Sequence, residues 1–133
     1  MDLPSLDDID EAIKNLTPIL RRTPLNFSER FNAYLKLECL QVTGSFKVRG
    51  AMNNLIIAHR NGDRRPVIAA SAGNHGRGVA FASRKLGLPC TIVVPLQTPQ
   101  VKVDGCKGYG ATVIRHGTTF DACLAYALKM TEE

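Results

Sequence analysis

Tryptophan is absent from this sequence, and aromatic residues are few, with three tyrosines and five phenylalanines. Proteins that bind nucleic acid commonly stack such side chains on bases and gather their basic residues into one patch. The net charge here is +5, but the basic residues are dispersed, and the tightest groups are Arg21-Arg22 and the segment 60–65. We therefore expect no nucleic-acid partner.

Paired cysteines and long apolar runs are also missing. The four cysteines show no C-x-x-C spacing, so we expect no metal or redox site and interpret Cys90 and Cys123 as small buried hydrophobic residues. No segment approaches the ~20 apolar residues that span a bilayer. The N-terminus is acidic and lacks the apolar core of a signal peptide. These absences predict a protein of the cytoplasm with no membrane partner.

Glycine is present, but never in a run of three or four, and no linker or low-complexity tract interrupts the chain. At 133 residues the chain is long enough for one domain with a hydrophobic core. Its composition, 44% hydrophobic and 22% charged, is that of an ordinary globular protein.

The second half of the chain alternates between apolar runs and helical patterns. Apolar runs predict strands at 67–70, 91–94 and 111–114, and the patterns that follow them predict helices over 74–86, 99–107 and 119–131. Upstream, Ser5 and the acidic residues after it predict the start of a first helix, then an irregular stretch from Pro18 to Pro24, a strand over 34–38 and a helix over 45–59. Strands that are apolar on both faces predict an α/β fold, an open parallel sheet with helices on both faces in three αβα layers.

Two segments of small residues carry the chemistry. The segment Thr43-Gly44-Ser45-Phe46-Lys47 places one lysine near the start of a predicted helix. The positive end of a helix dipole disfavours a charged amine, and a desolvated, neutral amine can attack a carbonyl to form a Schiff base. The segment Ser71–Gly78 joins a predicted strand to a helix N-terminus, where backbone N–H groups bind anions. A nucleophilic amine beside an anion site is what a pyridoxal phosphate (PLP) enzyme acting on amino acids needs.

With their neighbours, these segments resemble the PLP-dependent threonine/serine dehydratases and serine racemases, the tryptophan-synthase-β-like (fold type II) group. The resemblance runs in order along nearly the whole chain: Arg22-Thr23-Pro24-Leu25, Tyr34-Leu35-Lys36-Leu37-Glu38, Thr43 to Ala51, Ser71 to His75, Val94-Pro95, Pro99, Lys102-Val103 and Gly110 to Val113. The fold it implies is the small domain of fold type II PLP enzymes.

The resemblance implies roles for six residues. Lys47 is the catalytic Schiff-base lysine, which holds the cofactor and then moves protons, while Phe46 lies alongside the cofactor ring and Asn74 bonds the ring oxygen. The substrate carboxylate is held by Ser71, Gly73, Asn74 and His75. Four of these residues also have a structural alternative: a solvated lysine on an exposed helix face for Lys47, a core aromatic for Phe46, a helix N-cap for Asn74 and a satisfied structural histidine for His75. For His75 we favour the structural role over acid–base work.

Two features of the sequence refine this resemblance, and a third argues against a nucleotide-binding interpretation. Ala72 stands where serine racemases commonly carry a serine that protonates the substrate face opposite the lysine, which favours elimination over racemisation. Gly76-Arg77 stands where dehydratases often have Ala-Gln, so a bulky cation lies near the loop. The spacing Gly73-x-x-Gly76-x-Gly78 reverses the dinucleotide-binding pattern and lacks its acidic partner, which disfavours a nucleotide-binding α/β domain.

For domain organisation, we expect a lead segment over 1–42 and a small α/β domain over 43–133 that carries the lysine. Family members are usually more than twice this length, and their second half supplies a glycine-rich loop that grips the PLP phosphate. We expect that half of the cofactor domain to be absent here, and a homo-oligomer or a completing partner chain to form the site. The predicted function is β-elimination of L-threonine or L-serine to a 2-oxo acid and ammonia. A non-catalytic fragment or interaction module and a serine racemase are the alternatives.

Overall fold

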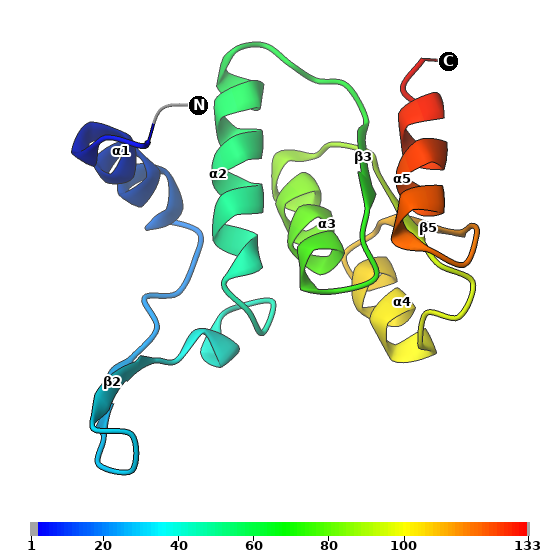
Figure 1. Ribbon diagram of the computed structural model, residues 1–133. Helices are drawn as coiled ribbons and strands as arrows, with labels where there is room; N and C mark the ends of the chain where they lie inside the picture. The colour runs from blue at the N-terminus through cyan, green and yellow to red at the C-terminus, as the bar shows by residue number, and fades with distance from the viewer. Residues whose placement is uncertain (1–2, 133) are drawn as a thin grey trace.

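Helices and strands alternate over residues 3–132, the range that the computed structural model describes (Figure 1). The elements follow in the order α1 (Leu6–Leu16), β1 (Leu25–Ser28), β2 (Ala33–Lys36), the 3-10 helix η1 (Glu38–Leu40), α2 (Lys47–Arg60), β3 (Val67–Ala70), α3 (Asn74–Leu86), β4 (Cys90–Val94), α4 (Gln100–Lys107), β5 (Thr112–Arg115) and α5 (Phe120–Lys129). Among these, no helix combines the length and the apolar character needed to span a bilayer.

The central feature is a three-stranded parallel sheet in the order β3-β4-β5. The middle strand, β4, is almost wholly buried, and its side chains alternate between the two faces. Ile92 and Val94 belong to a core built with α2, α3 and α4, whereas Val93 packs with Cys123 and Ala127 of α5. Figure 1 shows α2 and α3 on one side of the sheet and α5 on the other. The predicted three-layer α/β fold is therefore confirmed.

The sequence predictions for the individual elements are confirmed to within one or two residues for all the helices and for the three sheet strands. The first helix begins as expected, because Ser5 and Asp8 form a reciprocal capping box. The cysteine prediction also holds, since Cys90, Cys106 and Cys123 are buried and burial raises the pKa of each thiol. Cys39 is exposed.

Two elements were not predicted, the strand β1 and the 3-10 helix η1. Leu25–Ser28 and Ala33–Lys36 pair as an antiparallel hairpin, with Phe27 opposite Tyr34, and the predicted strand over 34–38 ends two residues early because Glu38 begins η1. The turn of this hairpin contains Asn32 at φ 45°, a left-handed conformation that asparagine tolerates. The hairpin extends away from the rest of the fold at the lower left of Figure 1.

Helix α2 does not lie on the sheet but packs against α3, and a glycine sets their separation. A Cβ atom added to Gly78 of α3 would lie 3.1 Å from both N and Cα of Val48 in α2. These distances are shorter than ordinary van der Waals contacts, so a side chain at residue 78 would require the two backbones to move apart by a few tenths of an ångström. This contact places the first turn of α2, which carries Lys47, against the first two turns of α3.

We expect Gly78→Ala to destabilise the fold by about 1–3 kcal/mol, because a methyl group there forces α2 and α3 apart. Gly50→Ala is the matched control, since residue 50 lies in α2 with open space around the added Cβ atom. Alanine is the better helix former, so this control is expected to gain about 0.5–1 kcal/mol. Denaturant unfolding of the two variants measures whether the free energy of unfolding falls in Gly78→Ala and rises in Gly50→Ala. Equal effects at the two positions would contradict the close approach at Gly78.

Candidate active site at the start of helices α2 and α3

Helices α2 and α3 begin at the same end of the molecule. In Figure 1 both start at the lower end, where strand β3 also finishes. Ligands of parallel α/β sheets bind outside the carboxyl ends of the strands. The two predicted segments, Thr43–Lys47 and Ser71–Gly78, therefore lie at the end of the sheet where a ligand site is expected.

Lys47 is the first residue of α2, as predicted, and Phe46 is its N-cap residue. The lysine is exposed, and its Nζ lies 5.1 Å from the centroid of the Phe46 ring. The Phe46 ring is itself 58% exposed. The desolvation that would favour a neutral amine is thus not supplied by the described residues of this chain. Phe46 is not a core aromatic here, and its exposed ring and the amine share one open surface.

The loop after β3 is organised by Ser71. Its Oγ accepts hydrogen bonds from the backbone N–H groups of Gly73 and Gly76, at 3.3 and 3.0 Å. A Cβ atom at residue 76 would lie 2.9 Å from the Ser71 carbonyl oxygen, so only glycine allows the chain to turn this closely. The Ser71 hydroxyl already caps the helix as an acceptor, and its proton remains available to a ligand.

The structural alternatives for Asn74 and His75 are not what the structure has. Gly73 is the N-cap residue of α3, and Asn74 is the first residue of the helix, so the N-cap interpretation of Asn74 was wrong. His75 is exposed, so it is not the buried, satisfied histidine that the structural interpretation requires. Both side chains are open to solvent beside the loop. Their ligand-binding roles stay predictions.

A small cavity of about 210 Å³ lies beside this loop, between α3 and α4. Its lining includes Gly73 and Asn74 together with the side chains of Arg77 and Lys102. Arg77, which the sequence singled out as a cation near the loop, runs past Gly105 and lies 5.9 Å from the ring centroid of Tyr109. The loop thus has a cationic neighbourhood on its α4 side. The sequence contains Lys102 within the Lys102-Val103 motif, which predicts no role for its side chain.

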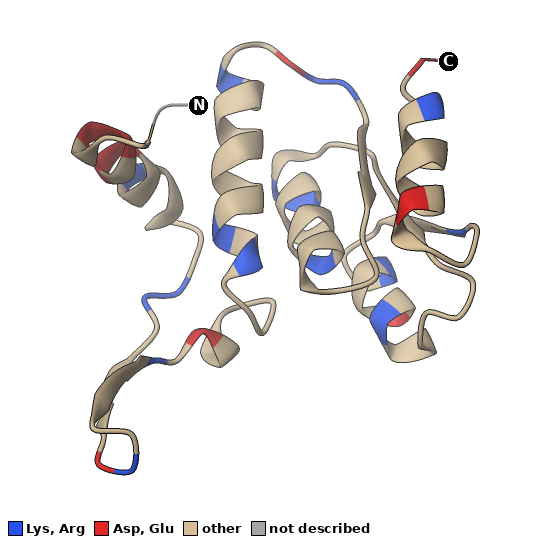
Figure 2. Ribbon diagram, viewed as in Figure 1, with Lys and Arg blue, Asp and Glu red and all other residues tan. Residues whose placement is uncertain are grey.

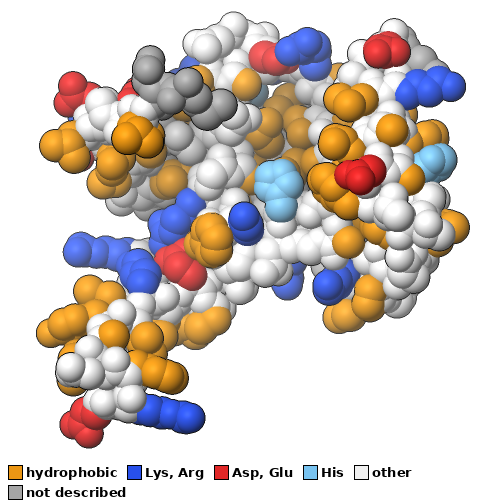
Figure 3. Space-filling model, viewed as in Figure 1, with side chains coloured by type: hydrophobic (Ala, Val, Ile, Leu, Met, Phe, Trp, Pro, Cys, Tyr) orange, Lys and Arg blue, Asp and Glu red, His pale blue; other side chains and the backbone are white. Residues whose placement is uncertain are grey.

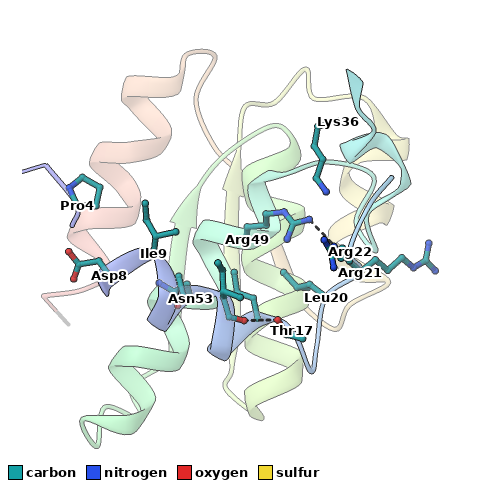
Figure 4. Close-up of a pocket in the computed structure, with 13 residues that line it drawn as sticks. Pro4, Asp8, Ile9, Thr17, Leu20, Arg21, Arg22, Lys36, Arg49 and Asn53 are labelled. Carbon is teal, nitrogen blue, oxygen red and sulfur yellow. Dashed lines mark hydrogen bonds between the residues drawn. The ribbon is translucent and has the colours of Figure 1, made fainter. Parts of the chain in front are cut away.

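A much larger groove, of about 860 Å³, lies elsewhere and contains none of the predicted site residues (Figure 4). Apolar residues of α1, including Ile9 and Ile13, line one part of it, and the cations Arg21, Arg22 and Arg49 line another. Size alone therefore does not identify the site. The smaller cavity includes Gly73 and Asn74 of the loop, whereas Lys47 lines neither cavity.

Comparison with known proteins shows the family of this chain. The sequence pattern of the family described as "Pyridoxal-phosphate dependent enzyme" matches residues 16–133. This chain belongs to that family. The family's enzymes use PLP, and they include lyases of amino-acid metabolism such as the threonine dehydratases.

Comparison with individual members of the family shows what share of a whole enzyme this chain covers. The catabolic L-threonine dehydratase TdcB of Staphylococcus aureus (strain USA300) is 43% identical over 97% of this chain but only 39% of its own length. A PLP-dependent aspartate racemase has a TM-score of 0.89 and 32% identity over 98% of this chain and 44% of its own. Serine racemase from Dictyostelium discoideum has a TM-score of 0.86 and 35% identity over 96% and 44%. The chain thus spans about two-fifths of these relatives.

One buried atom tests whether the residues present fit the family's cofactor. The Ser45 hydroxyl is buried two positions before Lys47 and finds no hydrogen-bond partner within residues 3–132. The Ser83 and Thr98 hydroxyls are likewise buried without a partner among these residues, and Ser45 is the one of the three that lies two positions from Lys47. With the exposed Phe46 and Asn74, it fits the pyridoxal end of PLP. No glycine-rich segment in the 133 residues fits the phosphate end.

Proposed function

We propose that this chain forms the lysine-bearing, N-terminal part of a PLP-dependent threonine/serine dehydratase. The observation that supports it best is the position of Lys47. It is the first residue of α2, packed through Gly78 against the helix that the Ser71–Gly78 loop opens, in a chain 43% identical to a threonine dehydratase. The division into a lead segment (1–42) and a small domain (43–133) is part of this proposal.

Each residue has a defined task in this proposal. The cofactor, when bound at Lys47, supplies an electron sink for the substrate's α-carbon. The Lys47 amine removes the α-proton, and the loop N–H groups and the Ser71 hydroxyl hold the substrate carboxylate, as does the exposed His75. The β-hydroxyl leaves as water, and hydrolysis of the released enamine consumes one water. The net products are one 2-oxo acid and one ammonia for each amino acid.

Racemisation is the second candidate, because an aspartate racemase and a serine racemase share this fold at 32% and 35% identity. Racemisation needs a proton donor on the face opposite the lysine. Ala72 occupies the position where serine racemases commonly have that donor, and its methyl group carries no exchangeable proton. A one-base site favours elimination. The third candidate, a non-catalytic fragment or interaction module, predicts no reaction under any of the conditions below.

The test supplies the missing portion in trans. The purified chain with PLP alone is expected to bind weakly and to turn over far below about 1 s⁻¹. With the C-terminal portion of the Staphylococcus aureus relative added, L-serine is expected to give mainly pyruvate and ammonia, with little D-serine. Ala72→Ser should raise the D-serine share at least about tenfold, whereas the Ala72→Gly control should not, because only serine adds a proton carrier.

Two outcomes contradict the proposal. Racemisation that exceeds elimination in the unmodified chain would show that another group serves the opposite face. A complemented mixture that folds and binds PLP but yields neither product would favour the non-catalytic alternative.

A further inference from the structure

The first turn of α2 places positively charged side chains at the positive end of the helix dipole. It carries two cations, Lys47 and Arg49, no acidic residue, and an N-cap residue without a side-chain hydrogen bond. The N-terminus of a helix bears a partial positive charge and is stabilised by anions. Figure 2 shows this basic turn at the lower end of α2, with the acidic residue of η1 close by. The compensating charge must come from another part of the chain.

Glu38, eleven residues upstream on η1, supplies that charge. Its Oε2 accepts a hydrogen bond from Arg49 Nε at 2.9 Å, and its Oε1 accepts one from Arg49 Nη2 at 2.8 Å. The Thr23 hydroxyl donates to the same Oε1 at 2.5 Å. Both carboxylate oxygens are therefore engaged. Two parallel hydrogen bonds from one guanidinium fix the relative orientation of the Arg49 and Glu38 side chains as well as the distance between them. Such hydrogen bonds between charged groups are stronger than those between neutral groups.

The pair lies within a wider set of hydrogen bonds that connects the lead segment to η1 and α2. Arg49 Nη2 donates to the Arg21 carbonyl at 3.2 Å, drawn in Figure 4, and Lys36 at the end of β2 donates to the Thr23 carbonyl at 2.6 Å. Gln41 adds bonds to both the N–H and the carbonyl of Arg21. The lead segment, η1 and the first turn of α2 are thus joined around one ion pair.

This pair differs from the other ion pairs of the described chain. The Glu38 and Arg49 side chains are 17% and 32% exposed. Arg60–Glu11 is a single exposed contact at 3.8 Å, and Arg65–Asp63 joins residues two positions apart. Exposed pairs of that kind contribute little to stability. The Glu38–Arg49 pair joins segments distant in the sequence and is half-buried.

The Arg49 guanidinium holds the pKa of Glu38 below its usual range, although burial acts in the opposite direction. A carboxyl whose pKa is lowered by folding stabilises the folded state above its ordinary value of about 4.3. That contribution is lost as the pH falls through the lowered pKa of the folded state. The pair is therefore fully formed at neutral pH.

We propose that Glu38 and Arg49 are positioning residues for Lys47, which fix the first turn of α2 without touching the lysine amine. Successive residues of an α-helix are about 100° apart, so Lys47 and Arg49 point about 200° apart, to nearly opposite sides of the turn. The ion pair holds one side of the turn, and the other side stays free for the ligand. This inference rests on the proposed role of Lys47, but the position of the turn can be measured without the cofactor.

The first experiment is amide hydrogen exchange on the chain without PLP. Glu38→Gln removes the charge but keeps the shape, and Asp63→Asn is the control that breaks the Arg65–Asp63 pair. In Glu38→Gln, amides of the first α2 turn, including the Arg49 N–H bonded to the Phe46 carbonyl, should exchange at least about tenfold faster, while those of α3 stay protected. Unchanged exchange, or an equal rise in α2 and α3, would overturn the inference.

The second experiment measures Lys47 itself. After incubation with PLP and borohydride, the pyridoxyl label on the Lys47 peptide is compared with that on the Lys102 peptide. The ratio of label on the Lys47 peptide to label on the Lys102 peptide should fall at least about tenfold in Glu38→Gln. It should fall by less in Arg49→Lys, because lysine keeps the positive charge but cannot form two parallel hydrogen bonds to Glu38. The double variant should be no worse than Glu38→Gln alone, because the two residues act as a unit.

The two proposals fail in different ways. No preference for Lys47 in the unmodified chain would refute its role as the cofactor lysine, whereas the exchange data would still decide whether Glu38 fixes the turn. A Lys47 preference that survives in Glu38→Gln would leave the proposed function intact and overturn the positioning role.

Discussion

Lys47→Ala is expected to eliminate the pyridoxyl label that borohydride fixes onto this chain after incubation with PLP. The reason is position. Lys47 is the first residue of α2, and its Nζ lies 5.1 Å from the centroid of the exposed Phe46 ring. Its neighbour Ser45 has a buried hydroxyl to satisfy. We expect no other lysine to replace it, because a Schiff base forms stably only where the protein holds the cofactor in place.

Peptide mass mapping measures this effect, and Lys102→Ala is the matched control. Lys102 also lies near the loop, since it lines the small cavity with Asn74, so it is the best-placed competitor. The control should leave the label on the Lys47 peptide unchanged. A label that remains in Lys47→Ala, or that is found mainly on Lys36 or Lys102 in the unmodified chain, would refute the assignment.

Local sequence signals predicted most of the α/β layers. The strands Val67–Ala70, Cys90–Val94 and Thr112–Arg115 lie at the apolar runs 67–70, 91–94 and 111–114, and the helices between them show helical spacing. Such signals depend only on near neighbours, so they survive without knowledge of the fold. The hairpin shows where they fail. Leu25, Asn26, Phe27 and Ser28 alternate between apolar and polar residues as a strand does, but the segment is short and lies outside the regular pattern.

Local sequence signals likewise predicted one part of the candidate site and missed another. The lysine and the Ser71 loop were predicted because each lies within one contiguous motif. The Glu38–Arg49 pair was not, although both residues belong to motifs that the sequence singled out, because their pairing depends on how η1 folds back onto α2. Spacing alone also could not show that the Ser71 hydroxyl accepts a hydrogen bond from the first turn of α3, or that the Ser45 hydroxyl is buried without a partner among residues 3–132.

The exposed side of the hairpin leads to the second large effect, which is self-association. Leu25, Phe27 and Tyr34 lie on one face of this two-stranded sheet and are 60%, 52% and 68% exposed. Figure 3 shows apolar side chains gathered over the hairpin and over α1. An isolated two-stranded hairpin is marginally stable in water, and an exposed apolar patch with free strand edges favours association. We therefore expect dimers or larger species in solution.

The double variant Phe27→Thr/Tyr34→Thr tests the hairpin as the associating surface. Threonine keeps the strand preference, but the change removes two aromatic side chains from each copy. Each aromatic buries about 150–250 Å², so the dissociation constant should rise at least about 100-fold. Phe120→Thr is the matched control, because Phe120 is also exposed but lies at the start of α5, away from the hairpin.

Sedimentation velocity over a concentration series measures these species. The control should associate as the unmodified chain does, and the double variant should run as a monomer. A monomeric unmodified chain would show that the exposed apolar surface does not drive association at these concentrations. Association that persists in the double variant would transfer the contact to the apolar face of α1, where Leu6, Ile9 and Ile13 are exposed beside the large groove. Ile9→Ser in the double variant would then be expected to dissociate the complex, because it removes apolar area from that face.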